Sequence, residues 1–341
     1  MKKPGLFLVF LVLFLSSVSA QTVPAGPGVD VYIAGWEENV AGKDVAYYWK
    51  NGVKTALSDG RIDARAEAVA VLGNDVYAAG YERNAAGTGV SCYWKNGVKT
   101  VLSDGRADTV AEAIAVSGND VYAAGWEQNA AGHFVACYWK NGVKTALSDG
   151  RTDTVAYAIA VSGNDVHAAG WENSADGSVA CYWKNGVKTV LPGISASAEA
   201  VAVSGNDVYI AGYAYNDAGT AGACYWKNGV KIDLSDGRIR AGASAIAVSG
   251  NDVYIAGGEN NAAGNRVACY WKNGVKTALS DGRTDAAARA VAVSGNDVYA
   301  AGWEDNAADN AGACYWKNGV KTVLSDGRTE ASASAIALIP R

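Results

Sequence analysis

Residues 67–102 read EAVAVLGNDVYAAGYERNAAGTGVSCYWKNGVKTVL and contain four short runs in which Val, Tyr and Trp alternate with small residues. Such runs are typical of β-strands. Gly73-Asn74 joins the first two runs and Asn96-Gly97 joins the last two. Both pairs favour two-residue hairpin turns, because Gly and Asn tolerate a positive φ. The predicted strands, named a to d in chain order, are 67–72, 75–82, 90–95 and 98–102.

The same unit recurs seven times, and each copy carries an Asp-Val-Tyr or Asp-Val-His triplet. A period of about 40–45 residues with four strands is typical of a β-propeller blade. The sequence therefore predicts an all-β fold, a single seven-bladed β-propeller of four-stranded antiparallel blades. The triplets are spaced by 45 residues five times and by 42 once, and begin at Asp30, Asp75, Asp120, Asp165, Asp207, Asp252 and Asp297.

The ring is expected to close by pairing the two ends of the repeat region. The first copy begins at strand b, and residues 334–339 form a last strand a that no strand b follows. Pairing 334–339 with 31–37 completes the first blade. We therefore expect the C-terminal strand to close blade 1.

Strand positions within a blade follow from composition. Strand a is the richest in Ala, which suits the crowded position nearest the axis, and strand d carries one Lys in every copy, which suits an exposed edge. In a four-stranded meander the short a–b and c–d turns lie on one face and the longer b–c and d–a links on the other. Because functional residues gather on loops held by a rigid scaffold, we expect any site on the b–c/d–a face.

The first 20 residues resemble a secretory signal peptide. Lys2 and Lys3 precede an apolar run over 6–15, and small residues precede Ala20. We expect cleavage after Ala20, a short linker over 21–29, the propeller over 30–341, and a secreted or periplasmic protein with no membrane span in the mature form. The alternative is an uncleaved anchor, although the apolar run is short for a bilayer.

The charge balance is mildly acidic. Removal of Lys2 and Lys3 takes the formal charge from −5 to −7, and such a balance argues against nucleic acid as a partner. The repeat lysines belong to the outer edge and to the face that carries the a–b and c–d turns. Most of the negative charge therefore lies on the opposite b–c/d–a face, which we call the loop face. This distribution favours neutral or cationic ligands there.

The order of a small-residue strand, Val-Tyr-x-Ala-Gly, a variable loop and Tyr-Trp-Lys-Asn-Gly resembles bacterial secreted propeller proteins with HAF-type extracellular repeats. The Tyr-Trp-Lys-Asn-Gly stretch at 48–52 and its six copies carry the resemblance, and Ala136-Cys137-Tyr138 stands where that family has His-Ala-Phe. The resemblance implies a propeller and an exported location. It implies no catalytic residues.

The cysteines and histidines suggest no reactive or metal site. The six cysteines occupy the same place in six strands c, where neighbouring copies are expected to lie over ~10 Å apart, beyond disulfide reach. We therefore expect free, buried thiols. His133 and His167 form no metal-binding pair, so we expect no metal, no cofactor and no catalytic residue among these groups.

The position that enters strand a varies between copies although Ala flanks it on both sides. We expect this position to surround the mouth of the central channel. The alternative is a neutral, drifting surface position. It is occupied in chain order by Glu67, Glu112, Tyr157, Glu199, Ser244, Arg289 and Ser334.

Two further features point to the same face. Trp126 and Trp171 end two strands b beside the loops, where an aromatic ring can either pack or stack on a sugar or peptide. In the fourth copy the d–a link, 191–198, is shorter and lacks Asp-Gly-Arg, which predicts a notch next to Tyr215. The candidate ligand-binding residues are Glu67, Glu112, Tyr157, Glu199, Arg289, Trp126, Trp171 and Tyr215.

Seven similar units suit recognition better than catalysis, which needs a few unlike groups in one constellation. We expect an exported, monomeric binding or interaction propeller with a carbohydrate or peptide ligand. The first alternative is an enzyme, a hydrolase or lyase, that uses the unlike rim residues, and a strongly raised carboxylate pKa in a closed pocket would favour it. The second is a repeat-built surface antigen.

Overall fold

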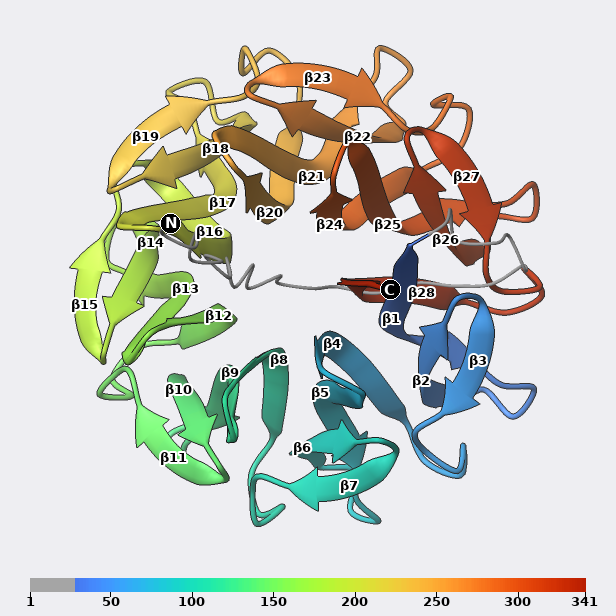
Figure 1. The fold of residues 1–341 in the computed structure, drawn as a ribbon. Helices are drawn as coiled ribbons and strands as arrows, with labels where there is room; N and C mark the ends of the chain where they lie inside the picture. Colours follow the sequence, from blue (N-terminus) through green and yellow to red (C-terminus); the bar gives the residue numbers. More distant parts are fainter. Residues whose placement is uncertain (1–27) are drawn as a thin grey trace, which may run out of the picture.

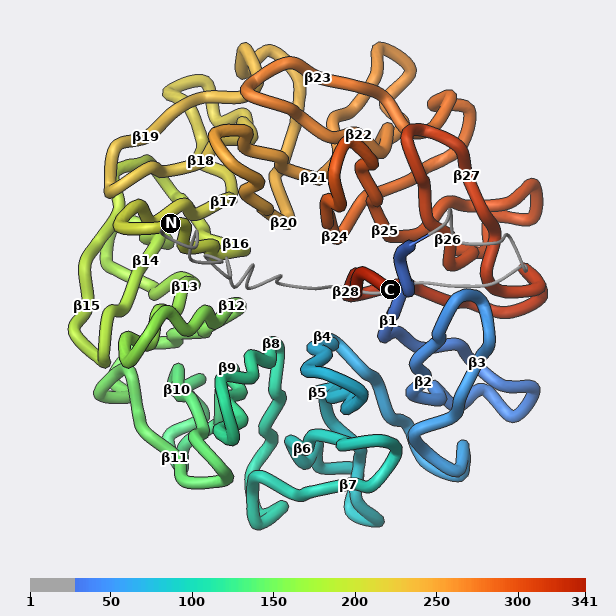
Figure 2. The backbone as a smooth tube through the Cα atoms, viewed as in Figure 1, coloured from blue at the N-terminus to red at the C-terminus, as the bar shows by residue number. Residues whose placement is uncertain are grey.

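The computed structural model describes residues 28–341, which form seven four-stranded antiparallel sheets arranged in a ring (Figures 1 and 2). The predicted all-β, seven-bladed propeller is therefore confirmed. The signal peptide predicted over 1–20 and nearly all of the linker predicted over 21–29 lie outside the described residues. No helix in the described range is long and apolar enough to cross a bilayer.

Each sheet is one blade, and its strands a, b, c and d follow one another from the axis outward. Blade 1 consists of β28 (Ala331–Pro340), β1 (Val29–Glu38), β2 (Asp44–Lys50) and β3 (Val53–Ala56), and blade 2 of β4 (Ala64–Leu72), β5 (Asp75–Arg83), β6 (Gly89–Lys95) and β7 (Val98–Val101). Blade 3 consists of β8 (Thr109–Ser117), β9 (Asp120–Gln128), β10 (Phe134–Lys140) and β11 (Val143–Ala146), and blade 4 of β12 (Thr154–Ser162), β13 (Asp165–Ser174), β14 (Gly177–Lys184) and β15 (Val187–Val190). Blades 5 to 7 are β16 (Ile194–Ser204), β17 (Asp207–Tyr215), β18 (Ala221–Lys227) and β19 (Val230–Asp233); β20 (Ala241–Ser249), β21 (Asp252–Asn260), β22 (Arg266–Lys272) and β23 (Val275–Ala278); β24 (Ala286–Ser294), β25 (Asp297–Asp305), β26 (Ala311–Lys317) and β27 (Val320–Val323).

The Asp-Val and Lys-Asn-Gly motifs join the two hairpin turns of each blade on one face of the ring. In blade 1 the Asn51 backbone has φ 48°, which an Asn tolerates in a tight turn. Its side-chain oxygen accepts the Val31 N–H at 2.8 Å, and its amide nitrogen donates to Asp30 at 2.7 Å. Lys50 lies 3.3 Å from the same carboxylate. The equivalent Asn donates to the equivalent Asp in all seven blades.

One Trp on each strand c forms the core between neighbouring blades. These seven side chains are at most 1% exposed. Trp183 of blade 4, for example, packs with Leu147 and Tyr122 of blade 3 and with Ile159 of its own blade. Its indole N–H donates to the Leu147 carbonyl at 3.0 Å. Burying an aromatic ring of this size at each junction supplies much of the apolar stabilisation between blades.

The six cysteines are free and buried, as the ring geometry predicts. Burial raises the pKa of the Cys224 and Cys269 thiols to about 12. At neutral pH these groups are therefore thiols and not thiolates, and they pack as small apolar side chains.

The C-terminal strand closes blade 1 as predicted. β28 pairs antiparallel with β1 from Val29↔Pro340 to Glu37↔Ala331. Ile336 and Leu338 on β28 are fully buried in the core shared with blade 7. Strands far apart in sequence thus make blade 1 and join the ring (Figure 1).

Strand a differs from its predicted bounds. It begins three residues earlier than expected in blade 2, at Ala64, so that Glu67 lies inside the strand and not at its entrance. Outer strand d is only four residues long in every blade. The earlier start of strand a leads directly to the geometry of the candidate site.

Deletion of residues 331–341 should destabilise the ring strongly. Full burial of an Ile or Leu contributes about 1.5–3 kcal/mol, so the loss of Ile336 and Leu338 alone removes a large part of the ~5–15 kcal/mol that typically holds a domain folded. Ile336→Ala should cost about 2–5 kcal/mol, whereas Ile239→Ala, at a site 39% exposed, should cost little. Urea unfolding measures all three. A truncated monomer with the stability of the full chain would contradict the closure.

Candidate functional site

The variable position of each blade is a β-bulge in strand a. In blade 2, Ala66 pairs with Gly80 and Ala68 pairs with Ala79, so Glu67 has no partner on strand b. A bulge turns the extra residue out of the regular alternation and re-aims its side chain. The register shifts in the same way at Glu112, Tyr157, Glu199, Ser244, Arg289 and Ser334.

A glycine on strand b makes room for each bulge. A Cβ on Gly80 would lie closer than 3.0 Å to the Arg65 carbonyl oxygen, a distance that real Cβ atoms do not tolerate. The same collision would occur in all seven blades, always with the backbone of strand a. A glycine inside a strand commonly marks such a close approach. The Val-Tyr-x-Ala-Gly motif is therefore required by the bulge and not by a turn.

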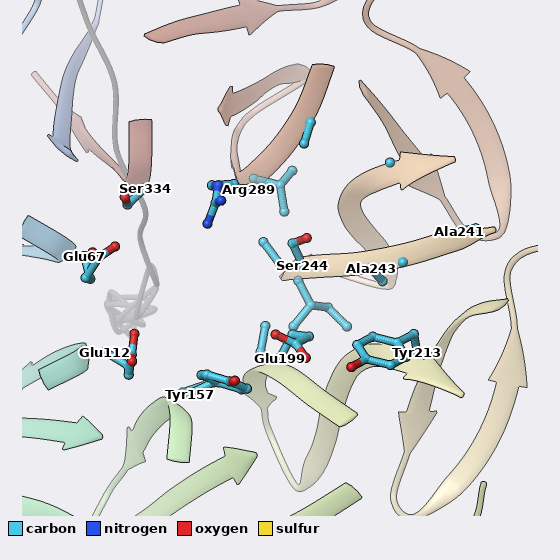
Figure 3. Close-up of a pocket in the computed structure, with 18 of the residues that line it drawn as sticks. Glu67, Glu112, Tyr157, Glu199, Tyr213, Ala241, Ala243, Ser244, Arg289 and Ser334 are labelled. Carbon is cyan, nitrogen blue, oxygen red and sulfur yellow. The ribbon is translucent and has the colours of Figure 1, made fainter. Parts of the chain in front are cut away.

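The bulge residues of all seven blades line one cavity of about 710 Å³ at the axis of the ring. Figure 3 shows them around the opening, with Glu67, Glu112, Tyr157 and Glu199 following one another and Arg289 reaching in from the other side. The structure thus brings together five of the eight predicted ligand-binding residues, in the predicted arrangement around the channel mouth.

Glu112 is the most perturbed acid of this cavity. Burial, helped by the nearby Glu67 carboxylate, raises its pKa from 4.5 to about 7. The Trp126 indole N–H donates to it at 3.0 Å and acts in the opposite direction, because the bond favours the ionised carboxylate. At neutral pH Glu112 therefore exists in both protonation states, and it can either give or take a proton.

Tyr157 and Glu199 continue the same wall. Burial raises the pKa of Tyr157 to about 12, although its hydroxyl accepts the Trp171 N–H at 3.0 Å. Burial also raises the pKa of Glu199, whose carboxylate accepts the Ser197 hydroxyl at 2.6 Å. This wall offers a ligand carboxyl and phenol oxygens whose positions are held by neighbouring donors.

Trp126 and Trp171 do not line the cavity but stand behind its wall. Each donates its indole N–H to the bulge residue of its own blade. Trp126 also packs on Phe134, with ring centroids 4.5 Å apart. In this structure both rings hold bulge residues in place, and neither ring is among the residues that line the cavity.

Tyr215 lies in a separate cavity of about 690 Å³ beside blade 5. Ile194 and Ser195 of the short d–a link also line it, so the notch predicted from that link is present. Tyr213 borders both this notch and the central cavity. Tyr215 is therefore next to the main site and not in it.

Two arginines at the central cavity were not predicted as site residues. Arg240 precedes β20 and Arg266 begins β22, and both line the cavity with Arg289. A signal for Arg240 exists in the sequence, because blades 2, 3, 4 and 7 have Asp63, Asp108, Asp153 and Asp285 at the equivalent position. A reversal of charge at one copy of a repeated position indicates that this residue has a role other than the one it has in the other blades.

Residues 28–341 contain no group of three or more His, Cys, Asp or Glu side chains placed to hold a metal ion. His167 is buried, and its Nδ1 lies 2.6 Å from the Tyr182 hydroxyl. Burial lowers its pKa. The Asp-Gly-Arg turns are surface turns, since Arg61 and Asp59 pair with each other at 3.5 Å while their side chains are 86% and 58% exposed.

Substituting the glycine opposite a bulge should destabilise the fold, whereas a glycine one residue before its partner on strand a should tolerate the same change. In blade 6, Gly257→Ala places a methyl group against the Gly242 carbonyl, while Gly242→Ala meets nothing within 4 Å. We expect a loss of about 3 kcal/mol for Gly257→Ala, a value at the upper end of ordinary overpacking, and less than about 1 kcal/mol for Gly242→Ala. Chemical denaturation of both variants checks this, and equal losses would show that the close approach is not required.

Glu112 should make folding stability depend on pH. Its pKa is raised in the folded state, so between about pH 4.5 and about pH 7 the folded protein binds the extra proton, and the Glu112 contribution to stability falls as pH rises. Glu112→Gln should therefore be more stable than the wild type at about pH 8, by on the order of 1–2 kcal/mol, and equal to it at about pH 4. Glu127→Gln, which removes an acid paired with Lys144 at 2.5 Å on the same blade, is the control. The same stability difference at both pH values would contradict the raised pKa.

No protein-family model and no curated protein sequence matches this chain. Solved structures do resemble it in fold. A puromycin-hydrolyzing peptidase of Mycobacterium tuberculosis aligns with a TM-score of 0.60 at 14% identity, over 93% of this chain and 54% of the peptidase. The acylaminoacyl peptidase of Pyrococcus horikoshii aligns at 0.57 and 11% identity, over 92% and 53%. The chain thus spans about half the length of each.

The β-propeller domain of the Trilobed protease from Pyrococcus furiosus aligns with a TM-score of 0.54 at 11% identity, over 93% of this chain and 99% of that domain. That domain is described as having an open velcro topology. The present ring differs, because β28 pairs with β1 and closes blade 1. Similarity at this level of identity establishes the propeller fold.

Proposed function

We propose that this protein is an exported binding propeller that holds a carbohydrate or a peptide at the channel mouth on the b–c/d–a face. The observation that carries the proposal is the contrast between scaffold and rim. Seven nearly identical blades present seven bulge side chains of different chemistry into one cavity. Packing does not require this variety, since Ser suffices at two of the seven positions.

The size and chemistry of the cavity support a small polar ligand. Its volume of about 710 Å³ falls within the ~300–1,000 Å³ that is usual for ligand sites. Glu67, Glu112 and Glu199 supply acceptors, and Tyr157 and Arg289 supply donors. Sugars and peptides both carry donors and acceptors along one chain, so they match this mixture. The signal-like residues 1–20 support the proposed export, and finding Gln21 at the N-terminus of the mature protein would test it.

Glu112 supports a second candidate, an enzyme of the hydrolase or lyase class. A carboxyl group with a pKa of about 7 can act as a general acid at neutral pH. Glu67 and Glu199 are close enough to act on it electrostatically, so a second carboxylate is at hand as a base or nucleophile.

Screening the mature protein on glycan and peptide arrays should identify a ligand whose affinity depends on the rim. Arg289→Ala and Tyr157→Ala should each weaken binding by about tenfold or more, the usual effect of losing a charge-assisted or buried hydrogen bond. Lys144→Ala, on outer strand β11, should change nothing. If only the lysine variant lost binding, the ligand would bind away from the central cavity and the proposed site would be wrong.

The same ligand distinguishes the two candidate functions. For a binding protein, the ligand should be recovered unchanged after prolonged incubation with the wild type. For an enzyme, mass spectrometry should find cleaved or eliminated product with the wild type, and Glu112→Gln should abolish its formation while binding persists.

A further inference from the structure

Blade 6 is built differently from its neighbours at the channel mouth. Gly258 stands at the end of strand b, where blades 1, 3, 4 and 7 have Trp and blades 2 and 5 have Tyr. The space is taken by Arg266, because a Cβ on Gly258 would collide with the stem of that side chain. Gly242, Ser244, Gly258 and Arg266 all line the central cavity, so its wall here consists of small residues and arginine in place of an aromatic ring. We refer to this part of the cavity, formed by residues of blades 6 and 7 and lined by Arg240, Arg266 and Arg289, as the arginine lobe.

The three arginines come from three different segments of the chain and line the same cavity. Among residues 28–341, none of them has a carboxylate within 4.0 Å, although other Lys and Arg side chains make 23 such pairs. Burial lowers the pKa of Arg266, and the positive charges of Arg289 and Arg240 lower it further. The acids that act on these arginines are Asp285, which accepts the Arg266 backbone N–H at 2.6 Å, and Glu199 and Glu112 on the cavity wall.

Arg65 of blade 2 is an arginine of the same fold that does have partners within the protein. Its Nε lies 2.6 Å from Asp44, and its guanidinium stacks on the Trp36 ring at 3.8 Å. Burial opposes its charge, but Asp44 and other nearby groups outweigh burial and raise its pKa. Arg266 is half-buried without such a partner, so no ion pair within the described residues neutralises its positive charge.

The fold does not need positive charge at these places. Position 240 is Asp in blades 2, 3, 4 and 7, and in blades 2 to 4 that Asp accepts a backbone N–H from the preceding blade's strand c. Position 266 is Phe134 in blade 3, where it packs on Trp126. Three guanidinium groups line one cavity and repel one another, at positions where the repeat offers neutral or acidic alternatives. Such an arrangement is typical of an anion-binding site.

We infer that the arginine lobe binds a carboxylate of the ligand, while the rest of the ligand lies along Glu67, Glu112 and Glu199. The carboxylate is either the acidic group of a uronic acid or the C-terminal group of a peptide. This inference rests on the proposed binding function and narrows its ligand class. A planar guanidinium matches a carboxylate with two parallel hydrogen bonds. The net acidity of the loop face, which favours neutral or cationic ligands, does not hold inside the lobe. There none of the three arginines has a carboxylate within 4.0 Å among the described residues.

Ligand pairs that differ only in the carboxylate test the inference. One pair is a uronic acid oligosaccharide and its methyl ester, and the other is a peptide with a free C-terminus and the same peptide amidated. The wild type should bind the free acid of one pair at least about tenfold more tightly, and the pair that responds identifies the source. Arg266→Gln should bring that ratio close to one while retaining the affinity for the uncharged member. Arg283→Gln, which removes an 88% exposed arginine of the neighbouring loop, should leave the ratio unchanged.

A variant copied from blade 3 guards against a folding artefact. Gly258→Trp together with Arg266→Phe recreates the Trp126/Phe134 pair and fills the lobe with a packing that this fold already accommodates. It should melt like the wild type and show no preference for the free acid. A wild type without preference, or either lobe variant that keeps the preference, would overturn the inference.

The lobe can also be tested without any array ligand, which separates its failure from a failure of the proposed function. Saturation-transfer NMR should detect binding of acetate to the wild type and to Arg283→Gln, but not to Arg266→Gln. If acetate binds in this pattern and no sugar or peptide does, the lobe stands and the proposed function fails. If acetate binds equally to all three proteins, or to none, the lobe is not a carboxylate site.

Discussion

The close approach of strands a and b at one glycine per blade is the constraint on which the candidate site depends. Because Gly80 and its six equivalents have no Cβ, the backbone of strand a can come near enough to form a bulge. The bulge releases one residue from the pairing that determines the direction of every other side chain in the strand. That residue then faces the axis, where it contributes little to the inter-blade core. The scaffold and the chemistry of the channel are thereby separated.

This separation explains how seven like blades make an unlike site. Most other positions in the blade serve packing or turn geometry, as the buried Trp183 and the turn residue Asn51 show, and these residue types repeat around the ring. At the bulge, Glu112, Tyr157 and Arg289 occupy the same place in three blades. One supporting group serves different bulge residues, since a Trp indole N–H donates to Glu112 in blade 3 and to Tyr157 in blade 4. Function can vary here without disturbing the ring.

The repeat period was enough to predict the blades, their strand order and the closure by the C-terminal strand, because each depends on a pattern that recurs seven times. The rim position was found because it varies between constant alanines. Its bulge was missed, since a two-against-one register leaves no trace in the alternation of strand a; the constant glycine of strand b was the available signal. Arg240 and Arg266 were missed because their meeting with Arg289 depends on three segments and on the small Gly258, and no single repeat unit contains that information.

The most direct test of this separation is the thermal unfolding of a variant that carries serine at all seven bulges. Ser244 and Ser334 are already present, so five substitutions are needed: Glu67→Ser, Glu112→Ser, Tyr157→Ser, Glu199→Ser and Arg289→Ser. If the bulge residues serve the cavity and not the fold, the variant should unfold in one cooperative transition within about 5 °C of the wild type. Loss of the cooperative transition would show that the rim side chains hold the ring together, and would contradict the account.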